Sequence, residues 1–195
     1  MKVAAIVEGD GEVAAVPVLL RRVAAWRTPA VFPEVLAPIR VRRDRFLNRN
    51  KEFERYLRLA AAKCEDGGWI LVLLDADDGC PAGLAAQVLT RAAACVPHRS
   101  ISVVFAKREF EAWFIAAAAS LDGHRGFKFD HADAVDAETP KDAKGWLRQR
   151  MAGGTYGETT DQPAFAARFD LQQAFEGSRS FRKLCSEWDR QATAP

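Results

Sequence analysis

One uninterrupted apolar run constrains the fold of this chain more than any other feature. Residues 69–74 read Trp-Ile-Leu-Val-Leu-Leu, and the run ends abruptly at Asp75. A strand without a polar face must be covered on both sides, which is the situation of a central strand in a parallel sheet. The run therefore predicts an α/β architecture with helices packed on both faces of a sheet.

Segments with strand and helix patterns alternate around this run. Residues 2–7 are nearly all apolar and predict a second buried strand. A weaker strand is expected near the sheet edge, because Pro38 interrupts its pattern. The expected strands are 2–7, 34–41, 69–74 and 101–106, and the expected helices are 12–26, 51–63, 81–95 and 109–120. This β-α order predicts a three-layer α/β fold with a mainly parallel sheet of about four strands.

The sequence changes character after Leu121. Residues 122–138 are polar and predict a loop. Thr139-Pro140 predicts a helix start, because threonine is a good N-cap and proline suits the first helical position. Further short helices are expected at 161–169, 170–175 and 180–191. We therefore expect a core over residues 1–120 and a helical extension over 121–195 that packs on it.

Composition is ordinary for a globular protein, with an apolar share of 49% and a net charge of +2. The four cysteines show no spacing typical of metal ligands, so reduced thiols are expected. There is no signal-peptide pattern, and the longest apolar run, 112–119, is too short to span a bilayer. We expect a cytoplasmic protein without a membrane partner.

Carboxylates follow three of the predicted strands. They are Glu8, Asp10 and Glu12 after the first, Asp75, Asp77 and Asp78 after the third, and Glu109 and Glu111 after the fourth. Parallel strands bring their carboxyl ends to one sheet edge, where ligands bind. At an effective dielectric near 20, each like-charged pair about 5 Å apart costs roughly 3 kcal/mol, so a cation is expected there. Carboxylates without histidine or cysteine suit Mg²⁺ or Mn²⁺, which commonly orient phosphates.

Two other interpretations of these acids stay open. Acidic residues in the first turn of a helix are commonly found there simply because they stabilise it. Residues 9–14 also satisfy the relaxed dinucleotide-binding pattern G-x-G-x-x-[GA] directly after a strand. The acids in and beside that pattern would repel a pyrophosphate, and arginines rather than an acid follow the second strand.

Basic residues are concentrated between positions 40 and 51, where six face a single acid, Asp44. Such a segment is either a solvated basic face or a track for a phosphate backbone. Lys107 and Arg108, directly before Glu109, could hold a substrate phosphate. The candidate nucleic-acid-binding residues are therefore Arg40, Arg42, Arg43, Arg45, Lys107 and Arg108.

Two acidic motifs resemble a known domain when they are taken together. Glu8-Gly9-x-x-Glu12 after the first strand, with Asp75-x-Asp77 after the strongest strand, resembles the TOPRIM domain of topoisomerases, primases and OLD (overcoming lysogenization defect) nucleases. The segment 108–114, Arg-Glu-Phe-Glu-Ala-Trp-Phe, and the tail 156–181 extend the similarity. Over most of its length the chain is similar to a small, uncharacterised bacterial TOPRIM-like family.

The resemblance implies a TOPRIM/Rossmann-like core and a metal-dependent nucleic-acid phosphodiesterase, similar to a nuclease or nickase. It would make Glu8 the acid/base or metal-binding glutamate and Glu12 a second metal ligand. Asp75 and Asp77 would hold Mg²⁺ or Mn²⁺, and Glu109 or Glu111 would complete a second metal site. The catalytic set on this interpretation is Glu8, Glu12, Asp75 and Asp77.

The resemblance also implies a possible separate ATPase partner and a role in phage defence or DNA repair. One departure is Tyr156-Gly157-Glu158, which carries an acid where a lysine is expected. Two alternatives remain: a non-catalytic regulatory protein that binds metal or nucleic acid, and a dinucleotide-binding enzyme.

Overall fold

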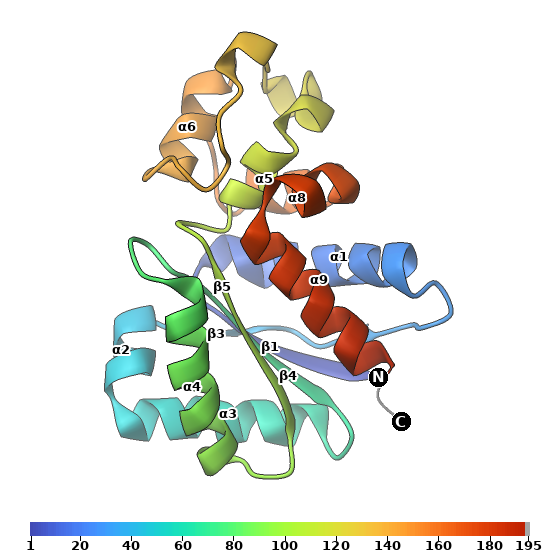
Figure 1. Ribbon diagram of the computed structural model, residues 1–195, viewed down its shortest axis with the longest axis vertical. Coiled ribbons are helices and arrows are strands. Elements are labelled where there is room, and N and C mark those ends of the chain that lie inside the picture. The colour runs from blue at the N-terminus through green and yellow to red at the C-terminus, as the bar shows by residue number, and fades with distance from the viewer. Residues whose placement is uncertain (194–195) are drawn as a thin grey trace.

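Five parallel strands form one sheet in the computed structural model, which describes residues 1–193. The order is β2-β1-β4-β5, and β3 also pairs with β1 on the side of β2. The strands are β1 (Lys2–Val7), β2 (Glu34–Val35), β3 (Ile39–Arg40), β4 (Trp69–Asp75) and β5 (Ser100–Ala106). The predicted α/β class with a parallel sheet is confirmed, and so is the helical character of the C-terminal region (Figure 1).

The central strand is β4, as its apolar sequence predicts. Every residue of β4 is buried, and the strand pairs with β1 on one side and with β5 on the other. The expected strand 34–41 is instead two short strands, β2 and β3, which flank Pro38. Proline has no N–H to donate to a ladder, and both pieces pair only with β1, at the sheet edge.

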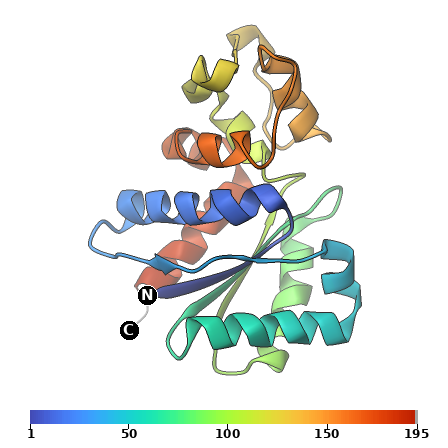
Figure 2. The same ribbon diagram turned by 180° about the vertical axis from the view of Figure 1, so that it is seen from behind.

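Helices cover both faces of the sheet. Figure 2 shows α1 (Asp10–Arg27) and α3 (Asn50–Cys64) on opposite faces. The remaining helices of this part are α2 (Arg43–Asn48), α4 (Pro81–Cys95) and α5 (Ala112–Ala116). The expected helix 109–120 is corrected to α5 followed by a 3₁₀ turn, Ala118–Leu121. The amide of Phe110 instead donates to the carboxylate of Asp75, at 2.8 Å, which holds the preceding segment in a loop.

The C-terminal region consists of short helices. They are α6 (Ala143–Arg150), α7 (Asp161–Ala166), α8 (Leu171–Gly177) and α9 (Arg179–Ala192). The expected helix start at Thr139 is wrong: Asp142 caps α6 by accepting from the Gly145 amide at 2.7 Å. The division at residue 121 stays a prediction, and residues 194–195 of the expected extension lie outside the described residues.

The C-terminal helices complete the core on the α1 side of the sheet. Phe165, Phe169 and Phe181 pack with aromatic residues of α5 in one buried cluster, which also contains residues of β1 and β4. The guanidinium of Arg22 in α1 donates to the carbonyl oxygens of Ala166 and Phe169, each at 2.8 Å. The other face has a separate buried cluster with α3 and α4. Among residues 1–193, no helix combines the length and apolar character that crossing a membrane requires.

Candidate functional site

The carboxyl ends of β1, β4 and β5 lie at one edge of the sheet, beneath the C-terminal helices (Figure 1). Glu8 directly follows β1, Asp75 ends β4, and Glu111 follows β5 at the start of α5. Two backbone hydrogen bonds join the loops after β4 and β5: Ala76 donates to Ala106 at 2.8 Å, and Asp77 donates to Arg108 at 3.0 Å.

Four of the predicted site residues form a buried group, which we call the inner acids: Glu8, Glu12, Asp75 and Glu111. Glu12, Asp75 and Glu111 are 5%, 8% and 0% exposed, and Glu8 is half-buried. Charged carboxylates are rarely buried to this extent unless they are paired. The negative charge of these four carboxylates therefore has to be compensated by neighbouring groups or by bound protons.

Two inner acids have structural hydrogen bonds. The carboxylate of Glu12 accepts from the Gly9 amide and closes the first turn of α1, so the capping interpretation holds for this residue. Asp75 Oδ1 accepts from the Phe110 amide and fixes the loop after β5. These bonds orient the carboxylates but do not neutralise their charge.

The other two inner acids each keep one oxygen without a partner. Oε1 of Glu111 accepts from the Tyr156 hydroxyl at 3.2 Å and from Gln162 Nε2 at 3.1 Å. Its Oε2 atom is buried without a hydrogen-bond partner, and so is Oε2 of Glu8. Buried polar atoms are almost always hydrogen-bonded, so these two oxygens are free to accept a hydrogen bond or to contact a cation.

The electrostatics of the inner acids reflect this crowding. Burial raises the pKa of Glu8 and of Glu12. Burial, with the charges of Glu12 and Glu111, raises the pKa of Asp75 well above its usual value. Burial also raises the pKa of Glu111 to about 8. Glu111 therefore retains its proton near neutral pH unless a cation stabilises its ionised form.

Within residues 1–193, one lysine lies close to these acids. It is Lys144, in the first turn of α6. Its Nζ atom is 3.4 Å from Glu158, and its amide donates to Glu109 at 3.0 Å. Burial acts to lower the pKa of Lys144, but the carboxylates of Glu111 and Glu158 raise it overall. The guanidinium of Arg43 also acts to lower the pKa of Glu8, and these two cations offset only part of the negative charge of the four inner acids.

The remaining acids of the same turns are exposed, and we call them the outer acids: Asp10, Asp77 and Asp78. Their side chains are 60%, 62% and 78% exposed. Each pairs with an arginine. Asp10 pairs with Arg40 at 2.9 Å, Asp77 with Arg43 at 3.0 Å, and Asp78 with Arg108.

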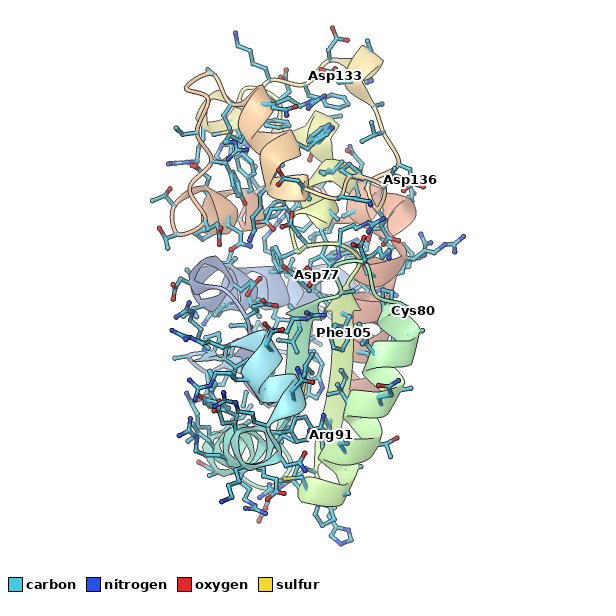
Figure 3. The ribbon with its side chains drawn as sticks, turned by 90° about the vertical axis from the view of Figure 1, so that its left-hand side faces the viewer. Asp77, Cys80, Arg91, Phe105, Asp133 and Asp136 are labelled. Carbon is cyan, nitrogen blue, oxygen red and sulfur yellow. The ribbon has the colours of Figure 1, made fainter. Side chains whose placement is uncertain are left out.

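The side chain of Asp77 is exposed and does not join the buried side chain of Asp75, although the sequence predicted that the two act as a pair. Its φ angle of 49° is left-handed, and Figure 3 shows it at the top of the sheet, above Phe105. Its charge still contributes to the raised pKa of Glu8, so it lies near the inner acids without being buried among them. Glu109 lies next to the inner acids but is not one of them. Its carboxylate accepts from the amide of Lys144.

A pre-formed metal cage is absent from the described side chains. Within residues 1–193, no three Asp, Glu, His or Cys side chains converge closely enough to hold a metal ion as they stand. The donor set nevertheless consists of carboxylate oxygens, which suits a hard divalent cation. Binding such an ion would require the side chains of the inner acids to move toward one another.

The predicted basic segment lies directly beside the acidic edge. Arg40 and Arg43 join it to the outer acids, and Arg45 pairs with Glu52. Arg42 is exposed and has no ion-pair partner within residues 1–193. A polar depression of about 240 Å³ lies between these side chains. Its lining includes Arg40, Arg42, Arg45 and Arg55.

The two predicted phosphate-binding residues after β5 have different surroundings. Arg108 pairs with Asp78, and Lys107 Nζ donates to the carbonyl oxygen of Gly79 at 3.0 Å. Both are thus held against the loop after β4. Lys107 also lines a separate pocket beside β5.

The glycine turn after β1 is filled by the protein itself. A Cβ atom on Gly11 would overlap the side chain of Gln162 and the carbonyl oxygen of Glu158. The requirement for glycine here therefore comes from the close approach of the segment that begins α7, and not from space kept for a ligand.

Four site residues were not assigned a role from the sequence: Lys144, Tyr156, Glu158 and Gln162. All four come from the C-terminal region. Tyr156 and Gln162 contact Glu111, and Lys144 contacts both Glu109 and Glu158. One weak signal existed, since a lysine in the first turn of a helix opposes the helix dipole. That signal depends on knowing that α6 begins at Ala143, which the sequence did not predict.

Comparison with known proteins places nearly the whole chain in one family. A family model described as Domain of unknown function (DUF4276) matches residues 7–188. No curated protein matches the chain, and no solved structure matches it.

Proposed function

This chain belongs to the DUF4276 family, and we propose that it is a Mg²⁺- or Mn²⁺-dependent phosphodiesterase that cleaves nucleic acid. One observation carries the proposal: Glu8 and Glu111 each keep a buried carboxylate oxygen without a partner. Both belong to a group of acids whose pKa values are all raised. A divalent cation would satisfy these oxygens and compensate the charge.

In this proposal Glu8, Asp75 and Glu111 would hold the metal ion, and Glu12 would support them from the first turn of α1. The ion would supply Lewis-acid stabilisation of the phosphate and of the charge that develops on it. Tyr156 and Gln162 fix Glu111 by holding its Oε1 atom.

Glu8 would accept a proton during the reaction, and Lys144 would stabilise negative charge. Glu8 is half-buried and its pKa is raised by burial. While Oε2 would contact the metal ion, the other carboxylate oxygen would accept the proton of an attacking water. Lys144 stays protonated at neutral pH because of the carboxylates around it. Its ammonium group would stabilise negative charge on the scissile phosphate, in the role expected for a lysine at position 158, where this chain has Glu158.

The basic segment supports nucleic acid as the substrate. Arg40 and Arg43 reach the outer acids, and Arg42 and Arg45 continue the basic surface away from the site. A phosphate backbone lying along them would reach the sheet edge at the outer acids, next to the inner acids. Arginines that contact the phosphate backbone bind it without regard to base sequence, so both DNA and RNA are candidate substrates.

A non-catalytic protein that binds metal or nucleic acid is the second candidate. It is favoured by the absence of three converging ligands among residues 1–193 and by Lys144, which already offsets part of the charge. The dinucleotide-binding alternative has less support, because Gln162 and Glu158 occupy the space over Gly11. The kinship with TOPRIM and OLD proteins, the ATPase partner and the role in defence or repair remain part of the proposal.

The test combines metal binding with cleavage. We expect Mg²⁺ or Mn²⁺ to raise the melting temperature, and Mn²⁺ to support cleavage of single- or double-stranded DNA or RNA. Glu8→Gln should abolish cleavage, whereas Glu34→Gln, at an exposed position on β2, should not. Metal stabilisation without any difference in cleavage would favour the non-catalytic candidate. Absence of metal stabilisation would refute the phosphodiesterase and a metal-binding protein, and would leave only a protein that binds nucleic acid without metal.

A further inference from the structure

The outer edge of β5 is a second surface that the proposed function does not use. β5 ends the strand order, so no described strand pairs with its outer side. The carbonyl of Ala106 accepts from Ala76 on the β4 side. Backbone groups of successive residues alternate between the two sides of a strand, so those of Val103 and Phe105 point outward. The carbonyl of Ile101, in the same alternation, accepts from Arg190 at 3.4 Å on that outer side.

A pocket of about 440 Å³ lies over this part of the edge. Its floor is formed by Val103 and Phe105. Figure 1 shows β5 between α4 and α9, and Figure 3 shows Cys80, at the start of α4, beside Phe105. The walls are Pro81, Ala82 and Ala85 from α4, and Arg179, Ser180 and Lys183 from α9.

The two walls differ in chemistry. The α4 wall is apolar, whereas the α9 wall carries Arg179 and Lys183, with Lys107 at the end of β5. Lys183 pairs with Glu187 at 2.5 Å, but Arg179 has no ion-pair or hydrogen-bond partner within residues 1–193. The one acid in the lining is Glu138, whose carboxylate already accepts from Ser178 and Ser180.

We propose that this groove binds an extended acidic segment of a partner protein, which adds to the sheet as a strand beside β5. The outward backbone groups of Val103 and Phe105 would pair with the segment, as in other cases of strand addition. Side chains of a strand alternate between its two faces. The segment would therefore place apolar side chains toward α4 and acidic side chains toward Arg179 and Lys183.

The charges favour this occupant over a second copy of the chain. Pairing two β5 edges would bring the same cations, Lys107, Arg179 and Lys183, face to face, and such like-charge contacts oppose association. An acidic segment instead neutralises them. The alternating pattern of apolar and acidic side chains makes the partner chemistry specific enough to test.

The probe is a fluorescein-labelled peptide of about seven residues in which glutamate and valine alternate. We expect saturable binding by fluorescence anisotropy. The double change Arg179→Glu with Lys183→Glu should weaken it at least about tenfold. The matched control, Lys141→Glu with Arg168→Glu, makes the same charge change at exposed positions outside the pocket and should leave binding unchanged.

Two further measurements test the strand geometry. A peptide with its central valines replaced by proline keeps its charge but cannot pair along the edge, so it should not bind. Ala82→Trp should block the groove, and bound peptide should slow the reaction of the exposed Cys80 thiol with a maleimide.

Several outcomes would overturn this inference. They are absence of saturable binding, equal weakening by the control pair, and equal binding of the proline peptide, which would indicate a simple anion pocket. A dimer in light scattering that Ala82→Trp abolishes would make a second copy the occupant. None of these variants alters an inner acid, so the result is independent of the phosphodiesterase proposal.

Discussion

The inner and outer acids come from the same short turns of the chain, yet the structure treats them differently. Asp75 and Asp77 are two residues apart, but Asp75 is 8% exposed and the side chain of Asp77 is 62% exposed. The outer acids each have an arginine partner, whereas the four inner acids lie near two cations, Lys144 and Arg43, and Arg43 already pairs with Asp77. The number of acids in a turn therefore does not indicate which carboxylates require a cation to compensate their charge. Burial does.

The physical reason is solvation. Water and an arginine compensate an exposed carboxylate, so such a pair contributes little to stability. A buried carboxylate loses its hydration, and its pKa rises unless a charge of opposite sign lies close to it. The inner acids are in this second situation, and the following predictions test whether the division is functional.

The largest expected effect is that of Asp75→Asn. We expect Mn²⁺-dependent cleavage to fall by about a hundredfold and metal stabilisation to disappear. Asparagine keeps an oxygen that can accept from the Phe110 amide, so the fold should persist. The matched control is Asp78→Asn at an outer acid. A variant at Asp75 that still cleaves at the normal rate would remove the inner acids from the mechanism.

Glu111→Gln should change the pH dependence of stability. The pKa of Glu111 is raised to about 8, so the folded protein holds a proton that the unfolded chain releases as pH rises above its ordinary value of 4.5. Metal-free stability therefore falls as pH rises between these values. The variant should be about 4 kcal/mol more stable than the wild type at pH 8 and about equal near pH 4.5. Urea unfolding across this range measures the difference.

A flat pH profile in the wild type would contradict that prediction. Glutamine keeps the acceptor for Tyr156 and Gln162, so the change isolates the charge. Asp78→Asn is the control from the outer acids and should leave the slope unchanged.

Lys144→Met should destabilise the metal-free protein at pH 8 by about 1 kcal/mol, because Glu12, Asp75 and Glu111 lose a nearby positive charge. Lys141→Met, at an exposed position of the same segment, should have no comparable effect. Chemical denaturation with and without Mn²⁺ measures both. If the two variants behave alike, Lys144 does not compensate the inner acids.

The smallest effects are expected at the outer acids. Asp10→Asn and Asp77→Asn each remove one exposed ion pair, and each should change stability by about 0.5 kcal/mol or less. Neither should alter the metal-induced rise in melting temperature. A loss of cleavage with Asp77→Asn as large as with Asp75→Asn would show that Arg43 releases Asp77 when metal binds. That result would move Asp77 into the inner group, as the TOPRIM resemblance implies.

Much of the sheet and the acids at its edge could be read from the sequence. The apolar runs at β1 and β4 must be buried on both faces, so they determine a parallel α/β sheet, and Pro38 determines a weak edge strand. Because strands and their following turns are contiguous in sequence, Glu8, Glu12, Asp75 and Glu111 could be named as candidates before the structure was known.

Only the tertiary structure decided which candidates share one environment. Lys144, Tyr156 and Gln162 reach the inner acids because α6 and α7 pack over the sheet edge, and no local pattern records those contacts. The same packing buries Glu111 completely, whereas the left-handed backbone of Asp77 leaves its carboxylate in water beside Arg43. Local sequence determines where a carboxylate stands along the chain, but its charge state depends on solvent and on neighbours that only folding brings together.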